Sequence, residues 1–338
     1  MNDPGNLHVA VLLATYNGCR FIESQIESLK ENDIPFTLHW IDDHSVDSTR
    51  ETVRALTTRL TIPLREWHQP ARQGVPSVFF TLLELVEADI YLFCDQDDVW
   101  QPGKIDITFE SLLSRLNAPC LCFSDPLMFT NEEPDRFITL SDALELTASS
   151  EEQELRSLTR NSAAGHTVGF TRPLRDLFLR HVEVARAYAF MHDWWLYTIA
   201  IASGEARMLR NVPTTLYRIH GANVLGEVPR KQSVVSQIFG APFKWRALKR
   251  YRRNLVTNAK GFIMASKVLP AGRKLERMVA AARLVTNLER RQSLAEWVNM
   301  VRLGVIWPRP RGEFVMFAVM CLFSYLEESK FGSVTDAH

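Results

Sequence analysis

The N-terminal half of the chain alternates short apolar runs with segments in which apolar residues recur every three or four positions. The apolar runs at 9–14, 36–41, 90–94 and 121–123 are typical of buried strands. The periodic segments predict helices at about 21–29, 48–60 and 76–87, with Ser45 or Asp47 as a cap for the second. Strands separated by helices of this length predict an α/β fold with a mostly parallel sheet and right-handed crossovers.

Polar residues follow each of these predicted strands. Ligands bind at the carboxyl ends of the strands in open α/β sheets, where the loops converge. We therefore expect one cleft lined by four polar strand ends, namely Thr15 with Asn17, Asp42 with Asp43, the run Asp95–Asp98, and Asp125.

The pattern changes in the second half of the chain. Residues 132–160 are polar and irregular, which predicts a mobile loop. After about residue 229 the pattern is helical and basic, with breaks at 240–242 and 269–272. We place the domain boundary near 225–230, which gives a catalytic domain at 1–228 and a mainly helical C-terminal region at 229–338.

The formal net charge of zero hides an asymmetry between these two parts. Residues 1–229 carry 19 Lys and Arg against 32 Asp and Glu, whereas residues 230–338 carry 20 against 7. A basic region of this kind suits nucleic acid or an anionic membrane, and charge alone does not choose between them.

The cysteines and the N-terminus predict a location. The five cysteines form neither a CxxC pair nor a paired framework, which is typical of a reducing compartment. The first residues are polar and lack the apolar segment of a signal peptide. We therefore expect a cytoplasmic protein.

Three carboxylates lie within four residues at the end of the 90–94 strand. Asp95, Asp97 and Asp98 would repel one another unless a cation lies between them, and oxygen ligands of this kind suit Mg²⁺ or Mn²⁺. A turn with helix-capping aspartates is the alternative, and for an isolated cluster the two interpretations have equal weight. Trp100 follows closely, and an aromatic residue beside polar ligands is hard to explain as surface.

Several motifs together resemble a known family. Thr15-Tyr16-Asn17, the segment 41–49 with Asp42 and Asp43, Asp95-Gln96-Asp97-Asp98-Val99-Trp100 and Lys104-Ile105 are similar to motifs of the family 2 glycosyltransferases of the GT-A fold. The resemblance is closest to bacterial rhamnosyltransferase-like enzymes of surface polysaccharide synthesis, and it covers about residues 7–226. It implies a GT-A, Rossmann-like catalytic domain.

The resemblance also implies how a nucleotide-sugar donor binds. Asp43, supported by Asp42, would accept a hydrogen bond from the N3–H of a pyrimidine. Asp97 would bind a metal that bridges the diphosphate, Asp95 would face the ribose or the metal, and Asp98 would contact the metal or the donor sugar. The full donor-binding set is Thr15, Tyr16, Asn17, Asp42, Asp43, Arg72, Asp95, Gln96 and Arg218.

A second group of motifs resembles the family's acceptor side. Asp193, in the segment 191–195, would act as the catalytic base, with a helix N-cap as its structural alternative. Gly165 and Thr167 would let the backbone approach the donor sugar, and His166 is either an acceptor contact or a structural residue. One of two tryptophans would stack on a sugar while the other lies in the core. The acceptor set is Trp100, Gly165, His166, Thr167, His192, Trp194 and Trp195.

The segment 217–226 would close over the donor. In related enzymes a histidine at this point supplies a metal ligand or a diphosphate contact, so His220 joins Asp97 and Asp98 as a metal candidate. Arg218 would donate to a phosphate. Gly221 and Gly226 would allow the movement.

The basic region adds an expectation about the acceptor. Residues 230–253 contain eight Lys and Arg and no acid, interleaved with aromatic and aliphatic residues. This pattern is typical of an amphipathic segment on anionic lipid, which would suit a lipid-linked acceptor. A solvated basic helix against the acidic domain is the alternative. The apolar run 314–326 is too short to span a bilayer and could form a packed helix, a homodimer contact or a membrane-surface helix.

The expected protein is an inverting glycosyltransferase that uses Mg²⁺ or Mn²⁺ and lies on the inner face of the cytoplasmic membrane. The resemblance implies L-rhamnose from dTDP-rhamnose as donor, and a saccharide or lipid-linked saccharide of lipopolysaccharide, O-antigen or capsule as acceptor. A UDP-sugar transferase, or a catalytically inert nucleotide-binding module, is the alternative. Residues 230–253 lack the aromatic, Gly-rich pattern of RNA-binding proteins, so we expect no nucleic-acid partner.

Overall fold

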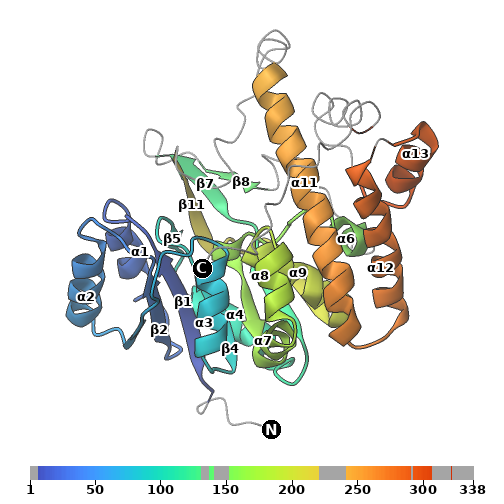
Figure 1. Ribbon diagram of the computed structural model, residues 1–338. Helices are drawn as coiled ribbons and strands as arrows, with labels where there is room; N and C mark the ends of the chain where they lie inside the picture. The colour runs from blue at the N-terminus through green and yellow to red at the C-terminus, as the bar shows by residue number, and fades with distance from the viewer. Residues whose placement is uncertain are drawn as a thin grey trace, which may run out of the picture.

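A computed structural model of the chain describes residues 7–130, 137–140, 152–220, 241–290, 292–306 and 321. Figure 1 shows a central sheet flanked by helices, with a group of longer helices from the C-terminal part beside it. The predicted domain boundary at 225–230 lies outside the described residues.

The main sheet has seven strands in the order β10-β6-β9-β4-β1-β2-β3. Every neighbouring pair is parallel except at β9, which runs antiparallel to both β4 and β6. The mostly parallel α/β sheet that the sequence predicts is therefore confirmed. Its strands are β1 (Val9–Thr15), β2 (Thr37–Asp42), β3 (Leu64–Trp67), β4 (Ile90–Cys94), β6 (Cys120–Ser124), β9 (Gly169–Thr171) and β10 (Glu205–Leu209).

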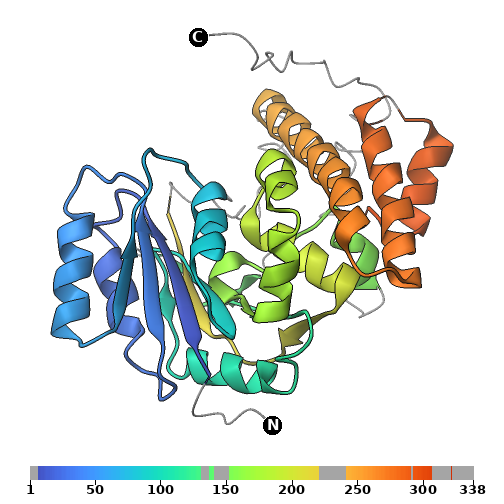
Figure 2. The same ribbon diagram turned by 60° about the horizontal axis from the view of Figure 1, so that its bottom comes forward.

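Helices cover both faces of this sheet, which is why its central strands read as continuous apolar runs. Successive side chains of β1 point to opposite faces, so Val9, Val11 and Leu13 join one core while Ala10 and Leu12 join the other. The first core is closed by α1 (Ile22–Ser28), α2 (Thr49–Arg59) and α4 (Lys104–Leu113). The second is closed by α3 (Ser77–Leu85), α7 (Arg172–Leu179), α8 (Val182–Tyr188) and α9 (His192–Ser203). Figure 2 shows α1 and α2, in blue, on the opposite side of the sheet from the green-to-orange helices.

Neither Ser45 nor Asp47, the two residues expected to cap the second helix, is its N-cap. The N-cap of α2 is Ser48, without a side-chain capping bond. Asp47 still satisfies one free helix N–H, because its Oδ1 accepts from Thr49 N at 3.1 Å.

A second sheet stands at the carboxyl edge of the main one (Figure 1) and has the order β5-β11-β7-β8. Its strands are β5 (Val99–Trp100), β11 (Thr215–Ile219), β7 (Leu127–Thr130) and β8 (Ile138–Thr139). The antiparallel pairing of β11 with β5 brings residues near 218 beside the acidic run that precedes β5. This small sheet therefore joins two motifs that lie far apart in the sequence.

Much of the segment 132–160 lies outside the described residues, and so does the mobile loop predicted there. The parts that are described form β8 and α6 (Glu152–Arg156). A short 3-10 turn, η2 (Gly165–Thr167), leads into β9.

The C-terminal part is helical, as predicted. It contains α11 (Ala241–Ala265), η3 (Ser266–Val268), α12 (Arg273–Thr286), η4 (Asn287–Glu289) and α13 (Leu294–Arg302). The gap between η3 and α12 agrees with the predicted break at 269–272, whereas the predicted break at 240–242 lies at the edge of the described residues. Buried residues of α11, among them Val256 and Phe262, belong to the same core as Trp195 of α9. No helix in the described part of the chain is long and apolar enough to cross a membrane.

Candidate functional site

The ends of three adjacent strands bring the polar motifs together. The register of the sheet pairs Thr15 of β1 with Asp42 of β2, and β4 lies on the other side of β1. The run Asp95–Asp98 follows β4 directly. Asp125 follows β6, which β9 separates from β4. The polar ends of β1, β2 and β4 therefore lie side by side, as predicted, whereas Asp125 lies two strands away from β4.

Asp97 faces His220 at this edge. The Oδ2 of Asp97 lies 2.9 Å from Nε2 of His220, and both side chains are partly open to solvent. The His220 ring stacks on Phe21 with the centroids 4.6 Å apart. Burial and the charge of Asp95 raise the pKa of Asp97. A carboxylate and an imidazole that face each other in this way can together bind a cation.

Arg218 supports the same place from β11. Its Nε donates to the carbonyl oxygen of Asp97 at 3.0 Å, and its backbone N–H donates to Oδ1 of Asp98 at 3.1 Å. The guanidinium also donates to Ser24 Oγ at 3.2 Å. These bonds fix the run Asp95–Asp98 against β11 and bring a permanent positive charge to it.

A second group consists of the buried residues Asp98 and His166 and the partly exposed Asp95. The Nδ1 of His166 lies 3.4 Å from Oδ2 of Asp98 and 3.7 Å from Oδ2 of Asp95. One ligand atom from each residue lies within 4.8 Å of the others, so the group could also hold a metal ion. The sequence suggested an acceptor contact or a structural role for His166, whereas the structure places its ring among the acids and against Tyr217.

The pKa values of Asp98 and His166 are shifted by their burial and by the neighbouring charges. Asp98 is fully buried, and burial raises its pKa to about 7. Burial opposes the charge of His166, but the neighbouring Asp98 and Asp95 outweigh it and raise the pKa of His166. The Oδ2 of Asp98 has no hydrogen-bond partner among the described residues. A buried carboxylate in this condition favours a nearby positive charge.

Lys104 provides a positive charge that sequence reasoning did not assign. Its Nζ is fully buried, donates to the carbonyl oxygen of His166 and donates to Thr215 Oγ1 at 2.9 Å. It lies 3.7 Å from the centroid of the Trp100 ring, and burial lowers its pKa to about 7. Lys104 was part of a recognised motif, but only the tertiary structure shows that it connects α4, η2 and β11.

Asp43 organises the loop that follows β3. Its Oδ1 accepts from Gln73 N at 2.7 Å and from the Gln69 amide, and its Oδ2 accepts from Gly74 N at 2.8 Å. Arg72 of this loop lies over the Tyr16 ring at 3.7 Å from its centroid. The loop therefore carries Arg72 to the end of β1.

The other donor-side residues mainly support this end of the sheet. Thr15 Oγ1 donates to Asp42 at 2.9 Å and accepts from Trp40 Nε1 at 3.0 Å. The Gln96 amide bonds both the N–H and the carbonyl of Tyr16, at 2.9 and 3.1 Å. Asn17 has a positive φ of 47° and accepts from Val46 N at 2.9 Å. Thr15, Asp42 and Gln96 therefore use their polar atoms to shape the loops.

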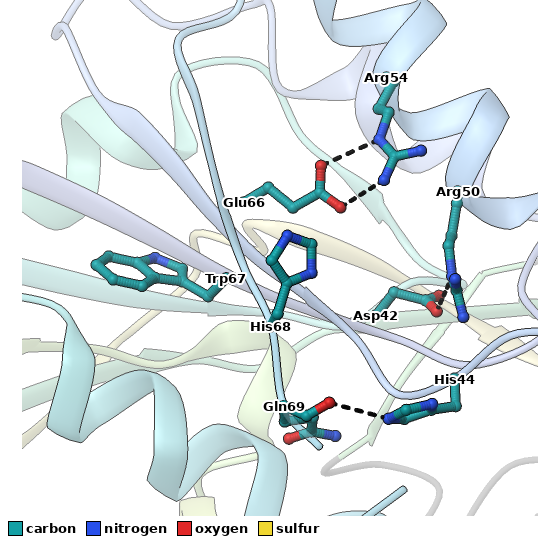
Figure 3. A pocket seen from close by; sticks show the side chains of 8 residues that line it. All are labelled: Asp42, His44, Arg50, Arg54, Glu66, Trp67, His68 and Gln69. Atoms are coloured by element: carbon teal, nitrogen blue, oxygen red, sulfur yellow. Dashed lines mark hydrogen bonds and ion pairs between the residues drawn. The ribbon is translucent and has the colours of Figure 1, made fainter. Parts of the chain in front are cut away.

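A small pocket adjoins Asp42 on the outer side, between β2, β3 and α2 (Figure 3). Its charged walls are paired, because Arg50 bonds Asp42 at 2.7 Å and Arg54 bonds Glu66 at 2.6 Å. It borders the Asp43 loop through Gln69, and the acidic run after β4 does not line it. The lining residues are Asp42, His44, Arg50, Arg54, Glu66, Trp67, His68 and Gln69.

Asp193 lies in the first turn of α9 and is nearly buried. Its Oδ2 accepts from Asn161 Nδ2 at 2.9 Å, and its Oδ1 accepts from Trp194 N at 2.6 Å. The helix begins at His192 with Met191 as N-cap, so the N-cap alternative for Asp193 is wrong. Burial raises the pKa of Asp193, and the charge of Asp95 adds to the shift. A carboxylate with a raised pKa is a better proton acceptor than an ordinary one.

Gly165 and His192 complete the surroundings of Asp193. A Cβ on Gly165 would lie 3.1 Å from His192 Nε2 and 3.4 Å from Asp193 Oδ2, so a side chain there would crowd both groups. The His192 ring stacks on Phe79 at 3.9 Å, and burial lowers its pKa. Neither ring nitrogen of His192 has a hydrogen-bond partner within the described residues. Thr167 Oγ1 is used inside η2, where it donates to the Ala164 carbonyl at 2.8 Å.

The three tryptophans of the acceptor set lie in the core, so the prediction that one of Trp194 and Trp195 stacks on a sugar is wrong. Trp100, Trp194 and Trp195 are 2%, 4% and 1% exposed, so none presents an open ring face to a sugar. Trp194 Nε1 donates to the Ser157 carbonyl at 2.6 Å, and Trp195 Nε1 donates to His181 Nε2 at 3.1 Å. Because α9 is apolar on all sides, it is buried on all sides.

Comparison with known proteins gives the site a chemical context. The sequence model described as "Glycosyl transferase family 2" matches residues 10–180, which is just over half of the chain. The chain belongs to glycosyl transferase family 2. It is therefore a glycosyltransferase, and the resemblance noted from its motifs is confirmed.

Two kinds of relative accompany this match. The dTDP-rhamnosyl transferase RfbG of Shigella flexneri is 25% identical over 224 residues, which is 63% of this chain and 73% of that protein. S. aureus TarS, crystallised with UDP, is 14% identical with a TM-score of 0.50, and the match covers 83% of this chain and 90% of TarS. A TarS crystal with UDP-GlcNAc has 12% identity and the same TM-score, covering 93% and 91%. These structures show the fold, and they confirm the GT-A architecture of this glycosyltransferase.

Proposed function

We propose that this glycosyltransferase moves a sugar, with inversion, from a pyrimidine nucleoside diphosphate to a saccharide acceptor. The observation that carries the proposal is that the acidic run after β4 borders two groups with different chemistry. On one side Asp97 faces His220 at 2.9 Å. On the other side Asp95 and Asp98 lie 3.7 and 3.4 Å from His166, and the adjacent Gly165 borders Asp193. A cation-binding pair and a carboxylate base therefore border the same acidic run.

The residues present fit a hard divalent cation. Asp97 and His220 form the solvent-accessible pair, and Asp98 adds a buried oxygen without a hydrogen-bond partner among the described residues. Oxygen and imidazole ligands of this kind suit Mg²⁺ or Mn²⁺. When bound, such an ion neutralises charge on the departing nucleoside diphosphate. Arg218, held on the acidic run, would add a fixed positive charge to the same place.

Asp193 would carry the proton transfer. In the proposed reaction, the acceptor hydroxyl attacks the anomeric carbon as the bond from that carbon to the diphosphate oxygen breaks. Asp193 takes the hydroxyl proton, and the configuration at the anomeric carbon inverts. Gly165 and His192 border the carboxylate and would contact the acceptor or the donor sugar.

Asp43 and Tyr16 are proposed to bind the nucleobase of the nucleotide-sugar donor. The Oδ2 of Asp43 accepts one hydrogen bond, from Gly74, and a carboxylate oxygen has two lone pairs, so it can take the N3–H of a pyrimidine as well. Uracil and thymine present the same N3–H edge. The similarity to a dTDP-rhamnosyl transferase favours dTDP-L-rhamnose, and a UDP-sugar is the alternative. The proposed pathway is lipopolysaccharide, O-antigen or capsule synthesis.

The acceptor is proposed to be presented at the inner face of the cytoplasmic membrane. Arg246, Arg250 and Arg253 are exposed on α11 at the spacing of one helix face. Leu248, Leu255 and Val256 are buried on the side that packs into the protein. This amphipathic pattern supports contact of residues 229–338 with anionic lipid. Apart from Cys321, the predicted apolar run 314–326 lies outside the described residues.

A donor screen tests the proposal. The purified chain is offered dTDP-rhamnose, UDP-sugars and GDP-sugars, each with Mn²⁺ and with a chelator, and release of the nucleoside diphosphate is measured. We expect metal-dependent turnover with a pyrimidine donor, highest with dTDP-rhamnose. If turnover occurs only with a UDP-sugar, that UDP-sugar is the donor instead of dTDP-rhamnose. If no donor turns over and none binds by calorimetry, the inert nucleotide-binding module is the better description.

A further inference from the structure

Asn161 makes a hydrogen bond to Asp193 that connects the segment before η2 to α9. Its Nδ2 donates to Oδ2 of Asp193 at 2.9 Å. Its Oδ1 accepts from Ala163 N at 3.0 Å, so the backbone fixes which end of the amide faces Asp193. The amide can therefore present only N–H groups to the carboxylate.

The surroundings make this bond important for the charge of Asp193. Burial opposes ionisation of the carboxylate, and Asp95 at the end of β4 opposes it further. His192 is the titratable neighbour on α9, and Gly165 presents only backbone from η2. Within the described residues, Asn161 is the side-chain hydrogen-bond donor to Asp193, and the backbone N–H groups of Trp194 and Gly165 also bond the carboxylate.

We propose that Asn161 is a positioning residue for Asp193, which holds Oδ2 in place and favours the ionised carboxylate. The inference rests on the proposed role of Asp193 as base. An amide N–H bonds a carboxylate more strongly than a carboxylic acid, so the contact lowers the pH at which the base becomes available. It also fixes the side-chain rotamer, and with it the direction from which an acceptor hydroxyl is deprotonated.

The test is the pH dependence of kcat in two variants. Asn161→Ala removes the donor, and we expect the acid limb of the profile to move up by about one pH unit. Asn161→Asp is nearly isosteric and places a second carboxylate against the first, so its acid limb should move further. The KM for the donor should change little in both, because the residue contacts neither the loop at Asp43 nor the pair at Asp97. Thermal unfolding verifies that each variant is folded.

Asn258 of α11 supplies the matched control. It is 3% exposed, and its Oδ1 accepts from Phe190 N at 3.4 Å near the start of α9. Asn258→Ala should lower the melting temperature and leave the acid limb in place. A wild-type acid limb in both Asn161 variants, or an equal shift in Asn258→Ala, would overturn the proposal.

The proposed roles of Asp193 and Asn161 can be refuted separately. If Asp193→Asn retains full transfer, Asp193 is not the base and the proposed function needs a different one. If Asp193→Asn loses transfer while the Asn161 variants keep the wild-type profile, the base stands and only the role of Asn161 is refuted.

Discussion

The Nε2 of His220 lies 2.9 Å from Oδ2 of Asp97, which joins the end of β11 to the segment between β4 and β5. Both side chains are partly exposed, in contrast to the fully buried Asp98. Because both side chains reach solvent, this pair can exchange its mutual contact for a cation. The buried Asp98 lies 3.4 Å from His166, and the charge of Lys104 also acts on it.

We expect Asp97→Ala to abolish metal-dependent turnover, with a loss of about 100-fold or more, because the variant removes a carboxylate that would hold the metal ion, and the ion would neutralise the diphosphate. His220→Ala should raise the Mn²⁺ concentration needed for half-maximal activity by about tenfold. The measurement is nucleoside diphosphate release as Mn²⁺ is titrated.

Asp106→Ala is the control for this experiment. Its carboxylate accepts backbone bonds from Asp33 and Ile34 on the far side of α4, so it should affect stability and not the Mn²⁺ requirement. An Asp97→Ala enzyme with a normal metal response would contradict the assignment.

Asp193→Asn should retain donor binding and lose transfer. The amide cannot accept the proton of the acceptor hydroxyl, and general-base catalysis contributes about 10² to 10⁴ in rate. Calorimetry measures donor affinity, and steady-state kinetics measures transfer. Asp176→Asn, an exposed aspartate paired with Arg175 on α7, should behave as wild type. Normal turnover together with tight donor binding would remove Asp193 from its proposed role.

Lys104→Met should destabilise the protein and weaken the response to metal. The Nζ bonds to the His166 carbonyl and Thr215 Oγ1 are lost, and each buried polar atom left without a partner costs about 1–3 kcal/mol. We expect a lower free energy of unfolding in urea and a higher Mn²⁺ requirement. Lys260→Met is the control, because Lys260 pairs with Glu289 at the surface and should cost less than about 1 kcal/mol. Equal effects of the two variants would show that Lys104 has no special role.

The fold was largely predictable because its central strands are buried on both faces. The run 90–94 coincides with β4, and the runs at 9–14 and 36–41 fall within one residue of β1 and β2. The strand β3 was not predicted, because only its residues Leu64 and Trp67 are apolar and none of the four is fully buried. The strands β5 and β8 contain two residues each, which is too short for any periodic signal.

The candidate site was predictable where one motif carries several polar residues. The run Asp95–Asp98 could be recognised in this way, but the division between the exposed Asp97 and the buried Asp98 depends on how β11 packs. Asn161 and Lys104 depend on tertiary contacts with residues 32 and 62 positions away, which spacing cannot reveal. The stacking role expected of one of Trp194 and Trp195 was wrong, because an aromatic residue beside a polar motif can point either into the core or into the site.

The last prediction concerns acid stability and the helix that carries Asp193. His181 Nε2 accepts from Trp195 Nε1 at 3.1 Å in the core, and burial lowers the pKa of His181 to about 4. Between about pH 6.5 and 4 the unfolded chain binds a proton at this residue and the folded chain does not. The contribution of His181 to the free energy of unfolding is therefore complete above pH 6.5 and is lost as the pH falls towards 4, by up to about 3 kcal/mol.

Urea unfolding at pH 7.5 and pH 5 measures this loss of free energy of unfolding. His181→Gln keeps an acceptor for Trp195 and does not titrate, so its free energy of unfolding should change less between the two pH values. His68→Gln, at an exposed position, should retain the wild-type difference. If His181→Gln and His68→Gln show the same pH dependence, the acid sensitivity does not arise from His181.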